Sequence, residues 1–460
     1  LFAICFAHCS RSLDMLTNKF SPILADLAMS NGRGVIWGGN VSRLDGSREY
    51  WHDVWEPYVE NMNFNVGPSP PTRTSGGTGI VTPNPDMACN RYIKFDYMRR
   101  YAFSPRPSGA GAHVLVTGHY ASLESSAAKG LHMKEGADKK KDQSYFLSTT
   151  PAEQFQGVVF PLEGFEKGND VNNNVEDSII THFEACGYIS TKLPSSGGSE
   201  SPNANAVTTR DIARAFKLPQ ANAKDSQGIC MVNDGNISVR ETAEVDAGSK
   251  TGPVGGGKVG FNGFMSTFID IPDQREGVYV DVDTNEVVAT FTIQDDYEGC
   301  QIMKNPLLYT VGQNARIGGG RVKYFVVGRR RGDSTHQHIV LVAGDTRHPS
   351  LYRDEVESDD FNVMDGGIKA ALVGGVEYCV DAVARVRHLQ PLIPCTVTIT
   401  TSGVRTHASV KFKQPVRAPC EGQVVCVYEE EGDEGGRRVV IGGGRITGMG
   451  KSYMEMDKEV

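Results

Sequence analysis

The chain has 460 residues, a formal net charge of -8 and ten cysteines. This length is enough for two or three domains with full cores, and the acidic balance means that any nucleic-acid surface must be a local basic patch. The cysteines are scattered without a CxxC pair, which argues against a secreted disulfide scaffold and a structural zinc site. No apolar run approaches the length of a membrane-spanning helix, so we expect no membrane partner.

The first 65 residues are predicted to be rich in helix. Apolar residues at helical spacing predict helices over 13–29 and 50–62, and residues 34–38 are typical of a short buried strand. Residues 1–7 are apolar but lack a basic flank, so they do not indicate a signal peptide. Since residue 1 is leucine, we expect a fragment, a processed form or a faulty gene model.

The stretch Val81–Phe95 combines a rigid turn, a carboxylate and a thiol. Pro83 and Pro85 fix φ, so a helix can begin at Asp86, with this residue as N-cap or first-turn anion. Cys89 is then expected in the first turn, where a helix N-terminus stabilises a thiolate. The alternative is a buried cysteine at the start of an ordinary amphipathic helix.

Two further stretches suggest ligand contacts. Residues 113–120 are predicted to be a buried strand that ends in a Gly-His turn, as at the carboxyl edge of a parallel sheet where ligands bind. The basic run Lys129–Lys141 is either a solvated charged segment or, with residues 144–147, a phosphate-binding edge. The glycine-rich residues 75–79 are expected to be a flexible linker, since no strand precedes them and no helix follows.

The second half of the chain contains another candidate thiol and many short strands. Gly228 allows a tight backbone beside Cys230, and Lys224 would favour its thiolate if the fold brings the two together. From about residue 277, alternating apolar residues and glycine turns predict a β-barrel or sandwich. The expected strands cover residues 277–282, 287–293, 324–327, 338–342, 378–387, 395–400, 408–412, 423–428 and 438–441.

Taken in order, these motifs resemble the tRNA-specific 2-thiouridylases from about Tyr50 to the end. The matching segments are Thr82–Phe95, Val116–Ala121, Lys141–Leu147, Lys224–Cys230, Tyr309–Gln313, Gly318–Gly320, Arg385–His388, Gly422–Gln423 and Gly442–Gly444. The resemblance implies a PP-loop-type α/β domain over 1–238, a small β-rich tRNA-binding domain over 239–322 and a C-terminal β-barrel over 323–460. The SGGVDSS-type phosphate loop of the family is not found in residues 1–48, so we expect the first domain to be incomplete.

The chemistry implied by the resemblance is ATP-dependent transfer of sulfur to C2 of the wobble uridine of tRNA. In the family, ATP with Mg2+ activates the uracil oxygen, and a persulfide supplies the sulfur. Cys230 would carry this persulfide, received from a cysteine desulfurase or a relay protein, and Cys89 would be the partner thiol that ends in a disulfide with it. Asp86 would be the acid or base, and with Asn84 and Pro85 it would contact the target base.

The resemblance also implies binding residues, since the target base must be turned out of its stack. Gly118 would contact ATP, and no metal ligands are expected in the protein. The expected tRNA contacts are His119, Lys141, Asp142, Gln143, Arg387, His388 and Gln423. His388 replaces a tyrosine of the family and can still stack on a base. Without the family, Arg387 would be interpreted as a solvated strand residue and Gln423 as a turn residue.

Two other functions compete with this one. A truncated, non-catalytic tRNA-binding remnant would follow from the absence of the ATP loop. A thiol-disulfide redox protein would use the two cysteines without tRNA or ATP, but would leave the C-terminal β domain without a role. We further expect a monomer that works in mitochondria, as the eukaryotic members of the family do, or otherwise in the cytoplasm.

Overall fold

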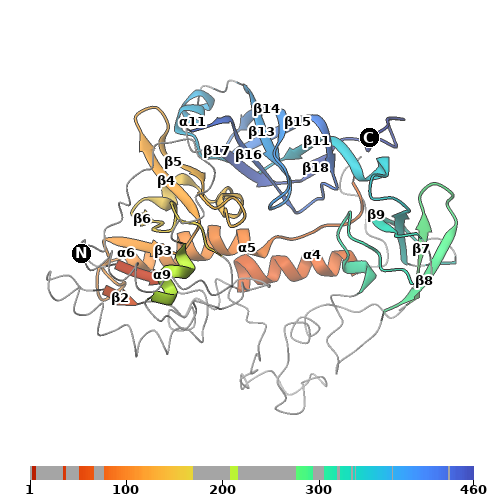
Figure 1. The fold of residues 1–460 in the computed structure, drawn as a ribbon, viewed down its shortest axis with the longest axis horizontal. Coiled ribbons are helices and arrows are strands. Elements are labelled where there is room, and N and C mark those ends of the chain that lie inside the picture. Colours follow the sequence, from red (N-terminus) through yellow and green to blue (C-terminus); the bar gives the residue numbers. More distant parts are fainter. Residues whose placement is uncertain are drawn as a thin grey trace, which may run out of the picture.

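The structure is a computed structural model. It describes residues 3–6, 35–37, 51–66, 77–168, 208–215, 276–293, 305–318, 322–332, 335–336, 338–373, 375, 377–433 and 436–460. Within these ranges an α/β region is followed by two β-rich units, which confirms the expected fold class (Figure 1). The helix expected at 13–29 lies outside the described residues.

The α/β region is built on a parallel sheet of strand order β2-β1-β3-β6. Its strands are β1 (Ala3–Phe6), β2 (Val35–Trp37), β3 (Val114–Thr117) and β6 (Val158–Val159). All its pairs are parallel, and β1 has β2 on one side and β3 on the other. The strand order therefore reverses between β1 and β3, and the carboxyl ends of such strands are where ligands of doubly wound sheets bind.

Two helical runs follow in the described part of this region. The first joins η2 (Trp51–Trp55) to α4 (Glu56–Val66) and confirms the helix expected over 50–62. The second joins α5 (Pro85–Ala88), the π-helix η3 (Cys89–Met98) and α6 (Arg99–Phe103). A third helix is α9 (Thr209–Ala215).

A hairpin connects the α/β region to the barrel. It consists of β4 (Ala121–Ser126) and β5 (Gly130–Glu135), and α7 (Ser144–Leu147) and η4 (Ala152–Phe155) follow it. Lys134 of β5 pairs with Val439 of the barrel, so the hairpin extends the barrel sheet.

The central unit is a four-stranded sheet of order β8-β7-β10-β9. It contains β7 (Glu276–Asp281), β8 (Val287–Thr292), β9 (Phe325–Arg331) and β10 (His338–Ala343), with η6 (Pro306–Leu308) beside it. Its core includes Leu307, Val326 and Val340 and continues into Trp55 and Tyr58 of the first helical run. The boundary expected between residues 322 and 323 does not separate this sheet from the barrel, because β9 and β10 hydrogen-bond to it rather than to the barrel strands. We therefore draw the boundary after Ala343.

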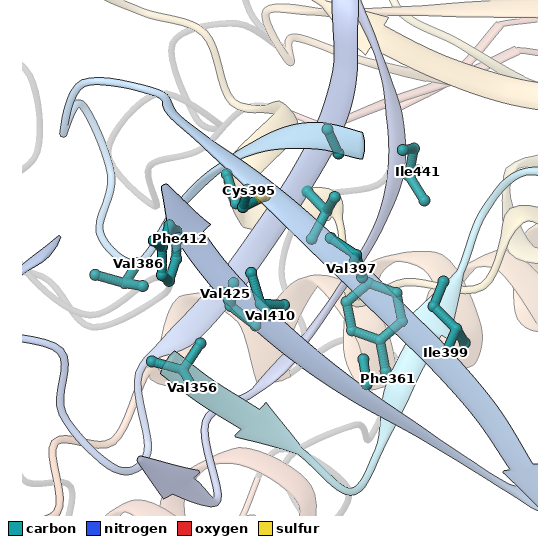
Figure 2. Close-up of a cluster of buried hydrophobic side chains, with 14 of the residues drawn as sticks. Val356, Phe361, Val386, Cys395, Val397, Ile399, Val410, Phe412, Val425 and Ile441 are labelled. Atoms are coloured by element: carbon teal, nitrogen blue, oxygen red, sulfur yellow. The ribbon is translucent and has the colours of Figure 1, made fainter. Parts of the chain in front are cut away.

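The last unit is a closed antiparallel barrel of strand order β11-β15-β14-β13-β16-β17. Strand β12 pairs with β17 and follows β11 after a bend at residues 359–360, which closes the barrel. Alternate side chains such as Val397, Ile399, Val410 and Phe412 fill its interior (Figure 2). The elements are η7 (Pro349–Leu351), β11 (Tyr352–Ser358), β12 (Phe361–Val363), α11 (Gly366–Leu372), β13 (Tyr378–Arg385), β14 (Ile393–Ser402), β15 (Arg405–Arg417), β16 (Val424–Gly432), β17 (Arg438–Arg445) and β18 (Gly448–Met449).

Candidate active site

The segment that leads into the second helical run is held by both β-rich units. Thr78 accepts a hydrogen bond from the backbone amide of Arg329 in the central sheet at 2.7 Å. The amide of Thr82 donates to the carbonyl oxygen of Glu421 in the barrel at 2.8 Å, and Gln423 Nε2 donates to the carbonyl oxygen of Thr82 at 3.3 Å. Both ends of this short segment are therefore fixed before the helix begins.

The helix begins one residue earlier than the sequence suggested. The side chain of Asn84 accepts a hydrogen bond from the amide of Met87 at 3.4 Å, and Pro85 occupies the first helical position. Asp86 is a first-turn anion, as expected, and not the N-cap. Cys89 is the fifth helical residue, so its expected place in the first turn is wrong: its amide already bonds to the carbonyl oxygens of Pro85 and Asp86.

Cys89 lies inside the protein. Its side chain is fully buried among Val54, Ile93 and Met98, in a small core between the two helical runs. The field of a helix N-terminus falls off within the first turn, so it acts on this thiol only weakly. For Cys89 to react, a partner group must therefore approach it within the protein.

A pocket of about 370 Å³ lies between the two helical runs and the barrel. Its first wall comes from the first helical run, with Tyr58 and Asn61, and its second from Asn84 and Pro85 at the start of α5. The barrel supplies the third wall. The other lining residues are His52, Asp53, Val54, Pro57, Pro83, Met87, Ala88, Arg91, Tyr92, Thr149, Asp360, Gly422, Val424 and Arg445. Two of the three residues expected to contact the target base thus line it.

Tyr58 connects this pocket to Asp86. Its phenol is buried, and burial together with the charge of Asp86 raises the pKa of Tyr58 far above the ordinary value. The phenol therefore stays protonated, with a carboxylate near it. Sequence reasoning did not find Tyr58, because only the packing of the first helical run against the second brings it to the site.

Gly118 directly follows β3 at the carboxyl edge of the parallel sheet, as predicted. It is exposed, and a Cβ atom built on it would meet nothing nearer than Leu162 Cδ1 at 3.7 Å. The register that pairs Phe6 of β1 with Thr117 of β3 places it beside the end of β1. This edge leaves room for a nucleotide to approach the backbone.

Several residues expected to bind tRNA are brought together after β3. The amide of Tyr120 donates to Gln143 Oε1 at 3.0 Å, and His388 Nε2 donates to the carbonyl oxygen of Asp142 at 3.0 Å. The His388 ring lies 4.4 Å from the ring of Phe146 between centroids. Segments 118–120, 141–143 and 387–388 therefore form one cluster.

Not all of this cluster reaches the surface. His119 is buried between the rings of Phe95 and Phe160, and its Nδ1 lies 2.7 Å from Thr117 Oγ1. The Asp142 carboxylate is buried and accepts hydrogen bonds from the amides of Gly136 and Ser144, and burial raises its pKa.

Arg387 and Gln423 connect parts of the protein to one another. Arg387 Nη2 donates to the carbonyl oxygen of Val311 at 2.7 Å and to that of Ala418 at 2.9 Å, which ties the central unit to the barrel. Arg387 is therefore not the solvated strand residue that the chain alone suggested. Gln423 donates a hydrogen bond to the carbonyl oxygen of Thr82. Through this side chain the barrel contacts the segment just before the second helical run, which is the candidate catalytic helix.

Lysines of the basic run Lys129–Lys141 form ion pairs where the β4–β5 hairpin packs against the barrel. Lys129 pairs with Glu429, Lys134 with Asp433 at 3.6 Å, and Lys139 with the buried Glu135 at 2.9 Å. Glu135 also pairs with Arg385 of β13 at 2.9 Å, and both side chains are less than a tenth exposed. The interpretation of these three lysines as a phosphate-binding edge is not supported, because carboxylates already neutralise them.

Some expected features fall on other parts of the chain. Cys230 and the segment from residue 223 to 232 lie outside the described residues, and so do residues 7–34. In the described part, no cluster of three metal-ligating side chains occurs. There, too, none of the helices combines the length and apolar character needed to cross a bilayer.

Comparison with known proteins gives two domain matches and a consistent set of relatives. Residues 36–179 match the tRNA methyl transferase HUP domain, and residues 371–446 match the aminomethyltransferase beta-barrel domain. The tRNA-specific 2-thiouridylase MnmA of Enterococcus faecalis is 26% identical over 388 residues, which cover 83% of this chain and 74% of the relative. The human mitochondrial tRNA-specific 2-thiouridylase 1 is 26% identical over 436 residues, covering 89% and 76%. MnmA of Chlamydia pneumoniae is 27% identical over 350 residues, covering 76% and 69%.

Proposed function

Since this chain belongs to the tRNA-specific 2-thiouridylase family, we propose that it is a tRNA-uridine 2-sulfurtransferase that replaces O2 of the wobble uridine with sulfur. One observation carries the proposal. Asn84 and Pro85 line a pocket at the start of the helix that contains Asp86 and Cys89, and the barrel closes the other side of that pocket. A pocket of this size falls in the range of about 300–1,000 Å³ that suits small ligands.

The sulfur step uses two thiols and leaves a disulfide. Cys230 holds the sulfur as a persulfide, delivered by a cysteine desulfurase or a relay protein. Cys89 attacks the inner sulfur and releases the outer one as sulfide, which adds to C2 of the uracil; alternatively, the outer sulfur attacks C2 first and Cys89 then displaces it from Cys230. Either route oxidises both thiols to a disulfide and reduces the transferred sulfur, so an external reductant must restore the site.

The residues at the start of the helix hold the base. Asn84 and Pro85 bound the pocket, and Asp86 moves the proton that the uracil ring gains or loses. The phenol of Tyr58 stays neutral beside Asp86, because burial and the charge of Asp86 both raise the pKa of Tyr58. Bound ATP would supply the activation that makes the uracil oxygen a leaving group, and the exposed Gly118 at the switch point fits close approach of its phosphates.

The tRNA is held by the cluster that follows β3. Lys141, Gln143, Arg387, His388 and Gln423 are partly exposed and make the direct contacts, whereas the buried His119 and Asp142 hold this cluster in place. We further propose that the protein acts as a monomer in mitochondria, where the human relative is named as working.

Mass spectrometry of tRNA tests the function. Cells that lack their own 2-thiouridylase should regain 2-thiouridine when they express the chain, and the purified protein should form it from tRNA, ATP, Mg2+ and a persulfide donor. A protein that bound tRNA without forming 2-thiouridine in either setting would instead be a non-catalytic tRNA-binding remnant.

A further inference from the structure

Two side chains at the edge of the pocket have no part in the sulfur chemistry. Tyr92 follows Cys89 by three residues on η3 and is 38% exposed. Arg445 ends β17 and is exposed. Both line the pocket that contains Asn84 and Pro85, and they reach it from opposite sides, one from the helix and one from the barrel.

The charges around the pocket leave Arg445 available. Arg91 pairs with Asp360 at 3.2 Å, and His52 contacts Glu56 at 3.0 Å. Asp53, which also lines the pocket, is exposed on the first helical run. The Arg445 guanidinium has neither an ion pair nor a hydrogen bond with any residue that the structure describes. A cation in this position is suited to an anion that enters with the substrate.

Tyr92 is held in place without being covered. The guanidinium carbon of Arg91 lies 5.3 Å from the centre of the Tyr92 ring, which is the geometry of a cation-π contact. Because Asp360 holds the other side of Arg91, the pair fixes the ring to the barrel. An exposed, oriented aromatic ring is a platform on which an unpaired base stacks.

From this arrangement we propose that Tyr92 and Arg445 form a second nucleotide subsite, in which Tyr92 stacks on the base next to the target uridine and Arg445 binds the phosphate that joins the two. The proposal rests on the proposed function, since it assumes that the target uridine occupies the pocket. When that uridine leaves its stack, its neighbour loses a stacking surface and its phosphate approaches the protein. An aromatic ring with a nearby cation is how proteins hold single-stranded RNA without reading its sequence.

Matched variants test this subsite. Tyr92→Ala and Arg445→Ala are compared with Tyr101→Ala, a tyrosine that is also 38% exposed but does not line the pocket, and with Arg405→Ala, an exposed barrel arginine outside it. The probe is an anticodon stem-loop RNA with uridine at the wobble position, and its Kd is measured over a range of salt concentrations. A second RNA carries a neutral methylphosphonate next to that uridine.

We expect Tyr92→Ala to weaken binding about tenfold and Tyr92→Phe to restore it, because stacking needs only the ring. Arg445→Ala should make the slope of log K against log salt shallower by about 0.7, as expected for one lost phosphate contact on single-stranded RNA. The methylphosphonate should weaken binding to the wild type and to Arg405→Ala, but not further to Arg445→Ala.

Other outcomes overturn the subsite. If the wild type binds and thiolates tRNA while Tyr92→Ala and Arg445→Ala behave like their controls, the proposed function stands and the subsite does not exist. If Arg445→Ala and the methylphosphonate have additive effects, Arg445 does not contact that phosphate. If the wild type binds no stem-loop and forms no 2-thiouridine, the proposed function and the subsite both fail.

Discussion

The amide of Thr82 donates a hydrogen bond of 2.8 Å to the carbonyl oxygen of Glu421. This bond joins the segment that leads into the second helical run, the candidate catalytic helix, to a loop of the barrel. Asn84, which caps the helix and lines the pocket, follows only two residues later. The position of the pocket wall is therefore set by how the barrel docks, although the residues expected to react belong to the α/β region.

We expect Gly422→Ala to disturb this docking. Gly422 has φ of +86°, and a Cβ atom there would lie 2.7 Å from the carbonyl oxygen of Thr82. The loop must shift, so thiolation should fall and the melting temperature should drop. Gly403→Ala is the control, because Gly403 also has positive φ but nothing lies within 4 Å of its Cβ position. It should cost about 1 kcal/mol from backbone strain alone, without loss of thiolation per folded molecule. Equal effects of the two variants would contradict the docking argument.

The buried pair between Glu135 and Arg385 should dominate the joint between hairpin and barrel. Glu135→Ala leaves the Arg385 charge buried without its main partner, which typically costs about 3–5 kcal/mol. Urea unfolding monitored by fluorescence would measure this loss. Glu124→Ala removes an acid whose side chain is 39% exposed and should cost at most about 1 kcal/mol. The double change Glu135→Leu with Arg385→Met should recover much of the loss, and no recovery would mean that the pair has another role.

The sequence predicted those parts of the fold that local patterns determine. Alternating apolar residues and glycine turns located the barrel strands, and the prolines before Asp86 located a helix start, since both signals act within a few residues. Strand partners depend on the whole chain, so the pairing of β10 with β7 on one side and β9 on the other could not be foreseen.

The site was less predictable, for the same physical reason. The depth of Cys89 in the helix depends on whether Asn84 or Asp86 caps it, a difference of two residues that both side chains allow. The contacts of Arg387 with Val311 and Ala418 join three distant segments, and nothing near Arg387 in the sequence signals them. Cys230 and the residues around it stay a prediction.

Stability should decrease at mildly acidic pH through His388. Burial lowers the pKa of His388 below its ordinary value of 6.5, and its Nε2 donates to the carbonyl oxygen of Asp142. Between the lowered pKa and 6.5 the unfolded chain binds more protons than the native protein, so the free energy of unfolding falls as pH falls through this interval. Melting temperatures of the wild type and His388→Phe from pH 7.5 to 5 would test this. The variant keeps a ring against Phe146 but cannot be protonated, so its decrease should be smaller; parallel curves would assign the pH dependence to other groups.

Replacing Cys230 and replacing Cys89 should stop thiolation at different steps. Cys230→Ser removes the sulfur carrier, so the protein should gain no persulfide and thiolation should fall by several orders of magnitude, while the Kd for tRNA stays unchanged. Cys89→Ser should still accept the persulfide but should not turn over, because nothing forms a disulfide with Cys230 to release the sulfur. Cys379→Ser replaces an exposed barrel cysteine and should behave like the wild type. Intact-protein mass spectrometry without reductant would follow the persulfide and the disulfide, alongside 2-thiouridine in the tRNA. Thiolation by Cys230→Ser at the wild-type rate would show that the sulfur is carried elsewhere, and a persulfide on Cys89 would reverse the two roles.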